Sequence, residues 1–289
     1  MKDFPIPVVA LGPGSQSEEE TLDYMPMPKD MNTYRPPVLP EPEALVGLDQ
    51  ARRALEDVLA LLKQGGEGGA PGHVALGMMS PSDFALVNQV LGEGEASAIV
   101  QLDADGLEVR VQEAVFAGVW RLMTYRHGAL VDDAIEVGPV PSLFAATAAD
   151  DVWPDGAMPR WQGALPPNVQ NAPMLIEEIR DQVSRWRAGQ VPHVVNLTLL
   201  PVTPEDIGFL DHHLGTGRVL MLSRGYGNCR ISNTRLRNCW RVVYYNSMDK
   251  VILNTVEVVD MPEVAMAAPE DLRDSFERLN EVMVYLDAA

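Results

Sequence analysis

The two cysteines of this 289-residue chain, Cys229 and Cys239, are the first residues to consider for chemistry. Thiolates bind zinc, iron and iron–sulfur clusters, but the spacing C-x9-C matches neither a redox C-x-x-C pair nor a zinc knuckle. A free cysteine also packs well as a small apolar side chain. We therefore predict structural roles for both thiols and no bound metal, with an iron or iron–sulfur carrier or redox protein as the alternative.

No enzyme signature occurs elsewhere in the sequence. The adjacent His212 and His213 would point about 100° apart on a helix, so they do not readily chelate one ion. The chain has no Walker A loop, no dinucleotide-binding glycine motif, no nucleophile elbow and no zinc-protease motif. The acidic residues are abundant, but no pair is distinguished as acid and base. The sequence predicts a protein that is not an enzyme, with no catalytic residue and no cofactor.

Residues 218–241 form a basic stretch within an acidic chain. The whole chain has 22 Lys and Arg against 41 Asp and Glu, a net charge of −19, which argues against nucleic acid or an anionic membrane as the main partner. The basic stretch has no acidic residue and can either contact an anionic partner or pair with the protein's own carboxylates. Its six arginines are Arg218, Arg224, Arg230, Arg235, Arg237 and Arg241.

The best candidate for a partner-binding site lies inside this stretch, at residues 223–230. Two glycines on either side of a tyrosine let the backbone approach another surface closely and present an aromatic anchor. Residues 101–106, which occupy the corresponding place earlier in the chain, read as an ordinary acidic hairpin turn. The residues predicted to contact a partner are Arg224, Gly225, Tyr226, Gly227, Asn228 and Arg230.

That correspondence comes from an internal duplication. Residues 203–223 repeat the pattern of residues 80–100 at an offset of 203 − 80 = 123, and later matches follow at offsets of 120 and 121. At the offset of 120, both cysteines fall on valines, which favours their structural roles. The matched pairs include Pro81/Pro204, Asp83/Asp206, Gly92/Gly215, Arg110/Arg230, Trp120/Trp240, Arg121/Arg241 and Tyr125/Tyr245.

The predicted fold class is α+β, with two tandem units in a pseudo-two-fold relation. Each unit starts with an amphipathic helix, followed by a short apolar strand, a second helix and then antiparallel strands. Ser80 and Thr203 are predicted N-caps, each followed by proline, and Asn171 is a predicted N-cap of the first helix in the second unit.

We divide the chain into four parts. Residues 1–42 form a Pro-rich N-terminal arm that could lie extended along a sheet edge, 43–149 the first unit, 150–171 a linker, and 172–289 the second unit with a terminal helix. The start of the chain lacks a secretory signal, and no apolar run of about 18 residues spans a bilayer. We expect a soluble, cytoplasmic protein without membrane insertion.

Several of these segments resemble the HupH/HyaF (HoxQ-like) family of hydrogenase expression and maturation proteins. The resemblance rests on ALGPGSQ at 10–16, LGEGEASAIV at 91–100, FAGVWR at 116–121, SRGYGNCRI at 223–231 and the run that begins YYNSMDKV at 244. It covers essentially the whole chain in the expected order.

The resemblance implies a non-enzymatic assembly factor, or chaperone, for an uptake nickel–iron hydrogenase. Such a protein is expected to bind the iron–sulfur small-subunit precursor before export and to hold or protect it and its clusters. A thioredoxin-like protein of the HupG/HyaE type is the second expected partner. The family supplies no catalytic or metal-binding residue to carry over.

Overall fold

The computed structural model describes residues 45, 47–77, 79–102, 106–154, 158–224 and 228–288. The chain divides into a unit of residues Met1–Tyr34 and a unit of residues Arg35–Ala289, and every described residue belongs to the second. The predicted N-terminal arm, residues 1–42, therefore lies outside the described residues. None of the helices formed by the described residues is long and apolar enough to cross a membrane.

The elements follow the same order twice along the chain. The first series is α1 (Asp49–Gly66), β1 (Gly72–Ala75), α2 (Pro81–Leu91), β2 (Ala96–Gln101), β3 (Leu107–Glu113), β4 (Val119–Arg126), β5 (Ala129–Val137) and α3 (Ser142–Asp150). The second is α4 (Ala172–Arg185), β6 (His193–Asn196), α5 (Pro204–Leu214), β7 (Val219–Ser223), β8 (Asn228–Asn233), β9 (Cys239–Tyr245), β10 (Val251–Val258), the 3-10 helix η3 (Glu263–Ala265) and α6 (Pro269–Ala288). The predicted α+β class is confirmed. The division into duplicated units stays a prediction, which this shared order supports.

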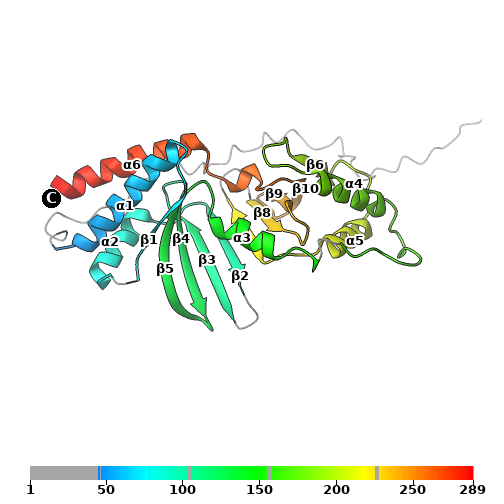
Figure 1. The fold of residues 1–289 in the computed structure, drawn as a ribbon, viewed down its shortest axis with the longest axis horizontal. Coiled ribbons are helices and arrows are strands. Elements are labelled where there is room, and N and C mark those ends of the chain that lie inside the picture. The colour runs from blue at the N-terminus through cyan, green and yellow to red at the C-terminus, as the bar shows by residue number, and fades with distance from the viewer. Residues whose placement is uncertain are drawn as a thin grey trace, which may run out of the picture. The chain divides into compact units, whose positions relative to one another are not determined.

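The ten strands formed by the described residues belong to one antiparallel sheet, with the order β1-β5-β4-β3-β2-β7-β8-β9-β10-β6 (Figure 1). The sequence did not predict that the two series of strands would be continuous. They join where β2 pairs with β7, with Ala98 opposite Met221 and Ile99 opposite Leu220. We call this β2–β7 pairing the seam. Two further backbone hydrogen bonds extend it, from the Gln101 N–H to the Arg218 carbonyl and from the Arg224 N–H to the Glu95 carbonyl.

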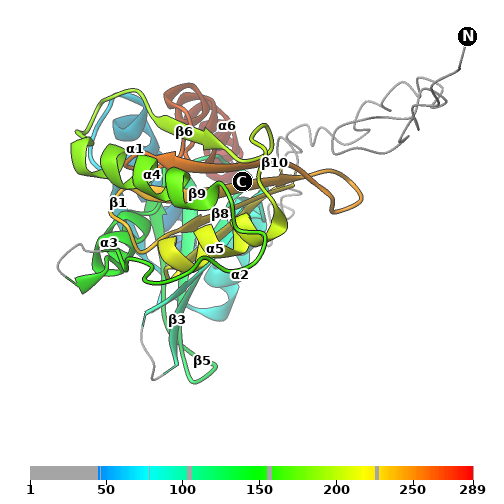
Figure 2. The same cartoon turned by 90° about the vertical axis from the view of Figure 1, so that its right-hand side faces the viewer.

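Helices cover the two ends of one face of the sheet. At one end α1 contacts β1 and β5 and is followed by α2, whereas at the other α4 contacts β6 and β10 beside α5 (Figures 1 and 2). The core beneath α4 and α5 includes Ile176, Phe209, Val195 and Val256.

The central core fills the opposite face, under α3 and η3. Ala98, Val100, Val219 and Met221 of the two seam strands pack there with Phe144 of α3. Burying a valine, methionine or phenylalanine side chain contributes roughly 1.5–3 kcal/mol. The seam strands are therefore part of the main core.

Two tryptophans that match in the duplication also lie in this core. Trp120 and Trp240 are almost fully buried. Their indole N–H groups donate to the carbonyls of Gly138, at 3.0 Å, and Asp260, at 3.2 Å. The two rings are therefore fixed in the same way, by a carbonyl just beyond β5 or β10.

A buried aspartate in each half joins two helices. Asp83 accepts a bond from the Ser80 hydroxyl at its own helix and from the Ala51 N–H of α1 at 2.9 Å. Asp206 closes a capping box with Thr203 and also accepts from the three N–H groups of residues 170–172 at 2.8–2.9 Å. Sequence analysis correctly identified the caps Ser80 and Thr203.

The predicted cap Asn171 behaves differently. It lies at the N-cap position of α4, but its side chain makes no cap bond there and donates to the Pro201 carbonyl instead. Asp206, from the next helix, supplies the acceptor for α4. A local sequence rule cannot identify a cap that comes from 35 residues away.

The terminal helix α6 packs against α1, although it follows the second series of strands. Leu272 of α6 approaches Gly65 and Gly118 so closely that a β-carbon at Gly118 would clash with it. The Ser275 hydroxyl donates to the Ala117 carbonyl at 3.0 Å. The end of the chain thereby holds the first helix pair against the rest of the sheet.

We expect Asp206 to contribute more to the stability of the fold than Glu205, its neighbour on α5. Desolvation opposes its ionisation, but four backbone N–H donors outweigh that effect and lower its pKa below the usual value. Asp206→Ala leaves these donors unpaired, so the free energy of unfolding should fall by about 3 kcal/mol in urea denaturation. The exposed neighbour Glu205 is the control, and Glu205→Ala should change that energy by about 0.5 kcal/mol or less.

The same carboxylate predicts a pH dependence. Because its pKa is lowered on folding, its contribution is present above the unfolded pKa and is lost as the pH falls through the folded pKa. The difference in stability between the wild type and Asp206→Ala should therefore shrink on acidification. An equal difference at neutral and strongly acidic pH would contradict this role.

Candidate functional site

The centre of the helix-covered face is left open between the two helix pairs. Residues that oppose each other directly on neighbouring strands share a face, so the registers show which side chains line this surface. We call "the open face" the surface formed by Ile99, Arg110, Leu220, Leu222 and Arg230 from strands β2, β3, β7 and β8. All five are exposed.

Two buried or half-buried arginines mark where the helices begin to cover the sheet. On one side Arg121 binds Asp133 and lies over the Phe84 ring of α2, at 4.7 Å from its centroid. On the other, Arg241 contacts Asp211 of α5 at 3.1 Å. Desolvation lowers the pKa of Arg241, and the nearby Asp211 carboxylate opposes that shift.

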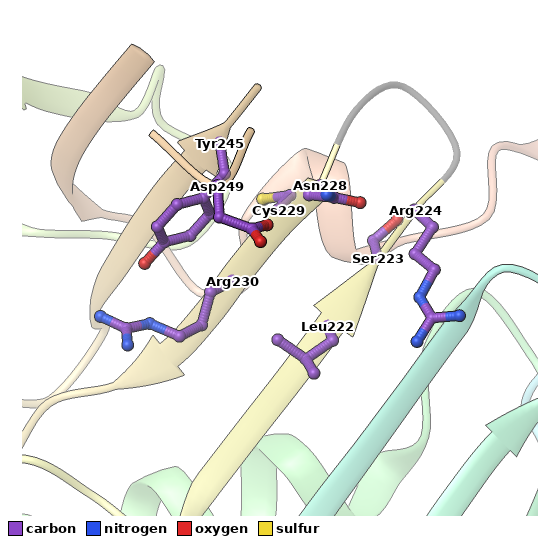
Figure 3. A pocket seen from close by; sticks show the side chains of 8 residues that line it. All are labelled: Leu222, Ser223, Arg224, Asn228, Cys229, Arg230, Tyr245 and Asp249. Carbon is purple, nitrogen blue, oxygen red and sulfur yellow. The ribbon is translucent and has the colours of Figure 1, made fainter. Parts of the chain in front are cut away.

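A hollow of about 310 Å³ opens at the β7–β8 end of the open face. Figure 3 shows Leu222, Arg230, Tyr245 and Asp249 on the same side of the strands, and the Arg224 side chain reaching toward β2. The hollow is lined by Leu222, Ser223, Arg224, Asn228, Cys229, Arg230, Tyr245 and Asp249.

A second hollow, of about 580 Å³, lies toward α5. It includes Ile99 and Leu220 of the seam, the turn 215–217 after α5, and Arg218 and Arg241. Gly215 in that turn has φ +66°, a backbone conformation that glycine adopts readily. Arg230 lines both hollows, so its guanidinium is available to a ligand in either.

The structure brings together those predicted site residues that it describes. Arg224 follows β7, Asn228 begins β8, and Arg230 lies two residues further on, all three at the first hollow. Gly225, Tyr226 and Gly227 lie outside the described residues.

The six arginines fall into two groups. Three contact groups of the protein: Arg218 binds Asp151, Arg241 binds Asp211, and Arg235 stacks over Trp153 at 3.7 Å. Arg224, Arg230 and Arg237 are exposed and form no ion pair with any residue that the structure describes, and of these three only Arg224 and Arg230 line the first hollow. Some arginines of the basic stretch therefore pair with the protein's own groups, whereas others are available to an anionic partner.

The first half has an arginine on the open face that is neutralised. Arg110 binds Glu108 at 2.6 Å and lies 4.4 Å from the Tyr125 ring centroid. Its counterpart Arg230 has Asn228 in the place of that glutamate. Because Asn228 is uncharged, Arg230 lacks the neighbouring carboxylate that Glu108 provides to Arg110.

Sequence analysis missed the apolar part of this surface. Ile99, Leu220 and Leu222 are 43%, 42% and 44% exposed on neighbouring strands. Their alternation with buried residues does show a two-sided strand. The pairing of β2 with β7, which brings them together, is not visible in the local sequence.

The cysteines are placed differently from the arginines. Cys229 and Cys239 are 3% and 1% exposed and belong to two different core clusters. Burial raises the pKa of Cys229 to about 11, against a hydrogen bond with Tyr244, and the pKa of Cys239 to about 12. Both thiols stay protonated near neutral pH, which argues against the carrier alternative.

The histidines have structural contacts. His213 is buried, with its Nδ1 2.8 Å from the Phe209 carbonyl, and His193 lies 2.8 Å from Glu178. Among the described residues, no cluster of three His, Cys, Asp or Glu side chains is arranged to hold a metal ion.

The part of the chain that the structure describes is thus an α+β fold around one ten-stranded sheet, with an open, basic and apolar surface at its centre. The family model described as "HupH hydrogenase expression protein, C-terminal conserved region" matches residues 49–155 and 169–286. The chain belongs to this HupH family, and the resemblance predicted from its motifs is confirmed.

Relatives from three bacteria match almost from end to end. The chain is 50% identical over 288 residues to the hydrogenase expression/formation protein HoxQ of Cupriavidus necator, covering 99% of both chains. It is 43% identical over 291 residues to the hydrogenase expression/formation protein HupH of Rhodobacter capsulatus, covering 98% of both. The hydrogenase-1 operon protein HyaF of Escherichia coli is 32% identical over 290 residues, with 96% of both covered.

The burial of the thiols predicts their reactivity. In the folded protein, neither cysteine should react with a water-soluble disulfide reagent at pH 8 within minutes, because both are covered and protonated. Both should react at once in denaturant, as measured by the absorbance of the released thiolate. Rapid reaction of one thiol in the native protein would contradict the buried placement and restore the carrier alternative.

Proposed function

We propose that this protein is an assembly factor for an uptake nickel–iron hydrogenase that binds the iron–sulfur small-subunit precursor on its open face. It holds the precursor and protects its clusters before export, and it does so in the cytoplasm as a chaperone and not as an enzyme. A thioredoxin-like protein of the HupG/HyaE type acts beside it.

Family membership supports the general part of this proposal. The family is one of hydrogenase expression proteins, and relatives that match over nearly their full lengths carry that description. A role in hydrogenase maturation follows from this membership. The small subunit as client and the protection of its clusters come from the resemblance noted in the sequence and remain the proposal.

The observation that carries the binding role is the pair Arg224 and Arg230 beside exposed apolar side chains. An arginine without an ion pair, in a chain with 41 acidic residues, is available to an external anion. Binding surfaces typically combine apolar anchors with arginine. The client's anionic cluster–thiolate region would face the basic stretch 218–241, with Tyr226 packed against the client as an aromatic anchor.

An anaerobic pull-down tests the proposed function. The full chain serves as bait in cells that express the hydrogenase operon, and iron and sulfide are assayed on bait and prey separately. Recovery of the small-subunit precursor, with iron on the prey alone, is the expected result. Iron on the bait in the absence of any client would instead favour the carrier that uses Cys229 and Cys239.

Removing the two proposed anchors should separate binding from stability. In the double variant Arg224→Ala/Tyr226→Ala, we expect the affinity for the precursor to fall by about 30- to 1,000-fold, because two anchors of roughly 1–2 kcal/mol each are lost. The melting temperature should stay within about 2 °C of the wild type, since Arg224 is exposed. Unchanged affinity would place the client elsewhere.

A further inference from the structure

We infer that the open face binds an acidic amphipathic segment of the client, with a carboxylate on Arg230 and apolar side chains along the β2–β7 seam. This inference rests on the proposed function and specifies the chemistry of the partner at that site. It also assigns a direction to the bound segment.

The anionic end of the segment is fixed by Arg230. Its guanidinium is exposed, lines both hollows and has no ion pair among the described residues. A guanidinium forms two parallel hydrogen bonds with a carboxylate, so an aspartate or glutamate of the client is a suitable partner. Figure 3 shows Arg230 and Arg224 on either side of Leu222, which puts a second cation near the same acid.

The apolar part of the segment is fixed by the seam. Ile99 and Leu220 oppose each other directly, and Leu222 follows two residues along the same strand. Single exposed apolar side chains are common on proteins, but three neighbours on a sheet face form a contiguous patch. Arg230 opposes Leu222 directly on the next strand, so the apolar patch and the cation adjoin.

The two halves differ in charge at corresponding places around this face. Seven positions of the first half carry two bases and four acids, 2 − 4 = −2, whereas the seven counterparts carry three bases and one acid, 3 − 1 = +2. The first set is Asn88, Glu93, Glu95, Glu108, Arg110, Arg121 and Asp133; the second is Asp211, Thr216, Arg218, Asn228, Arg230, Arg241 and Asn254. Two further acids reduce the positive charge of the second half: Asp151 binds Arg218, and Asp249 lines the first hollow.

This asymmetry orients the client. The acidic end of the client's segment is attracted to Arg224 and Arg230 of the second half and is repelled by the excess of acids in the first half. Its acidic end would lie over β8, and its apolar end would extend across Leu220 toward Ile99. The difference in charge between the two halves thus favours one direction of the bound segment.

The substitution Asn228→Glu tests this assignment without removing any core side chain. It copies the first half, where Glu108 neutralises the arginine two residues further on. The new carboxylate should occupy Arg230, and the affinity of the purified full chain for the small-subunit precursor should fall about tenfold. The control Arg237→Glu makes a larger charge change at an exposed position of the same basic stretch, outside both hollows, and should alter the affinity less than about twofold.

A second pair of variants tests the apolar half. Leu220→Ser/Leu222→Ser should weaken precursor binding about tenfold, since both side chains are exposed and available to the client. Leu130→Ser, at a similarly exposed leucine of the β4–β5 hairpin, is the control and should leave binding unchanged. The melting temperatures of these two variants and of Asn228→Glu and Arg237→Glu verify that the fold is intact.

The outcomes separate the two proposals. Weakening by both Asn228→Glu and the leucine pair, with neither control affected, supports the acidic amphipathic segment. If neither Asn228→Glu nor the leucine pair changes the affinity for the precursor, this inference is overturned and the proposed function still stands. Failure of the unaltered protein to bind the precursor overturns the proposed function and this inference with it.

Discussion

The pairing of β2 with β7 is the interaction on which the rest of the structure depends. It joins two series of strands into one sheet, and its inward side chains, among them Val100 and Met221, lie in the central core. Its outward side chains form the floor of the open face, because the helix pairs cover only the two ends of the sheet. Stability and the candidate site therefore share the same two strands, on opposite faces. The helix α6 reinforces this arrangement by packing against α1.

The predicted duplication provides an internal control for assigning roles. Features that both halves keep, such as Asp83 and Asp206 at the helix ends or Trp120 and Trp240 in the core, have matching structural contacts. Residues that differ between the two halves indicate a function specific to one half, because the shared fold does not require the difference. Arg230 keeps the position of Arg110 but lacks its neutralising glutamate. The divergence lies at the surface where a partner has access.

Much of the fold could be predicted from the sequence because it follows local rules. The caps at Ser80 and Thr203 and the class of the fold needed only spacing and residue type. The continuous sheet, the docking of α6 on α1 and the cap that Asp206 gives to α4 could not, since each joins segments far apart in the chain. The candidate site shows the same limit. Its arginines stood out by composition, whereas its apolar patch arises only when β2 meets β7.

The central claim is that the hydrogenase small-subunit precursor lies on the open face, and site-specific photocrosslinking tests it most directly. A photoreactive phenylalanine derivative is placed at Leu220 on the open face and, in a separate variant, at the equally exposed Leu130 on the β4–β5 hairpin. On illumination of the complex, we predict a crosslink to the precursor from position 220 and none from position 130. A complex that forms but crosslinks only from position 130 would contradict the account.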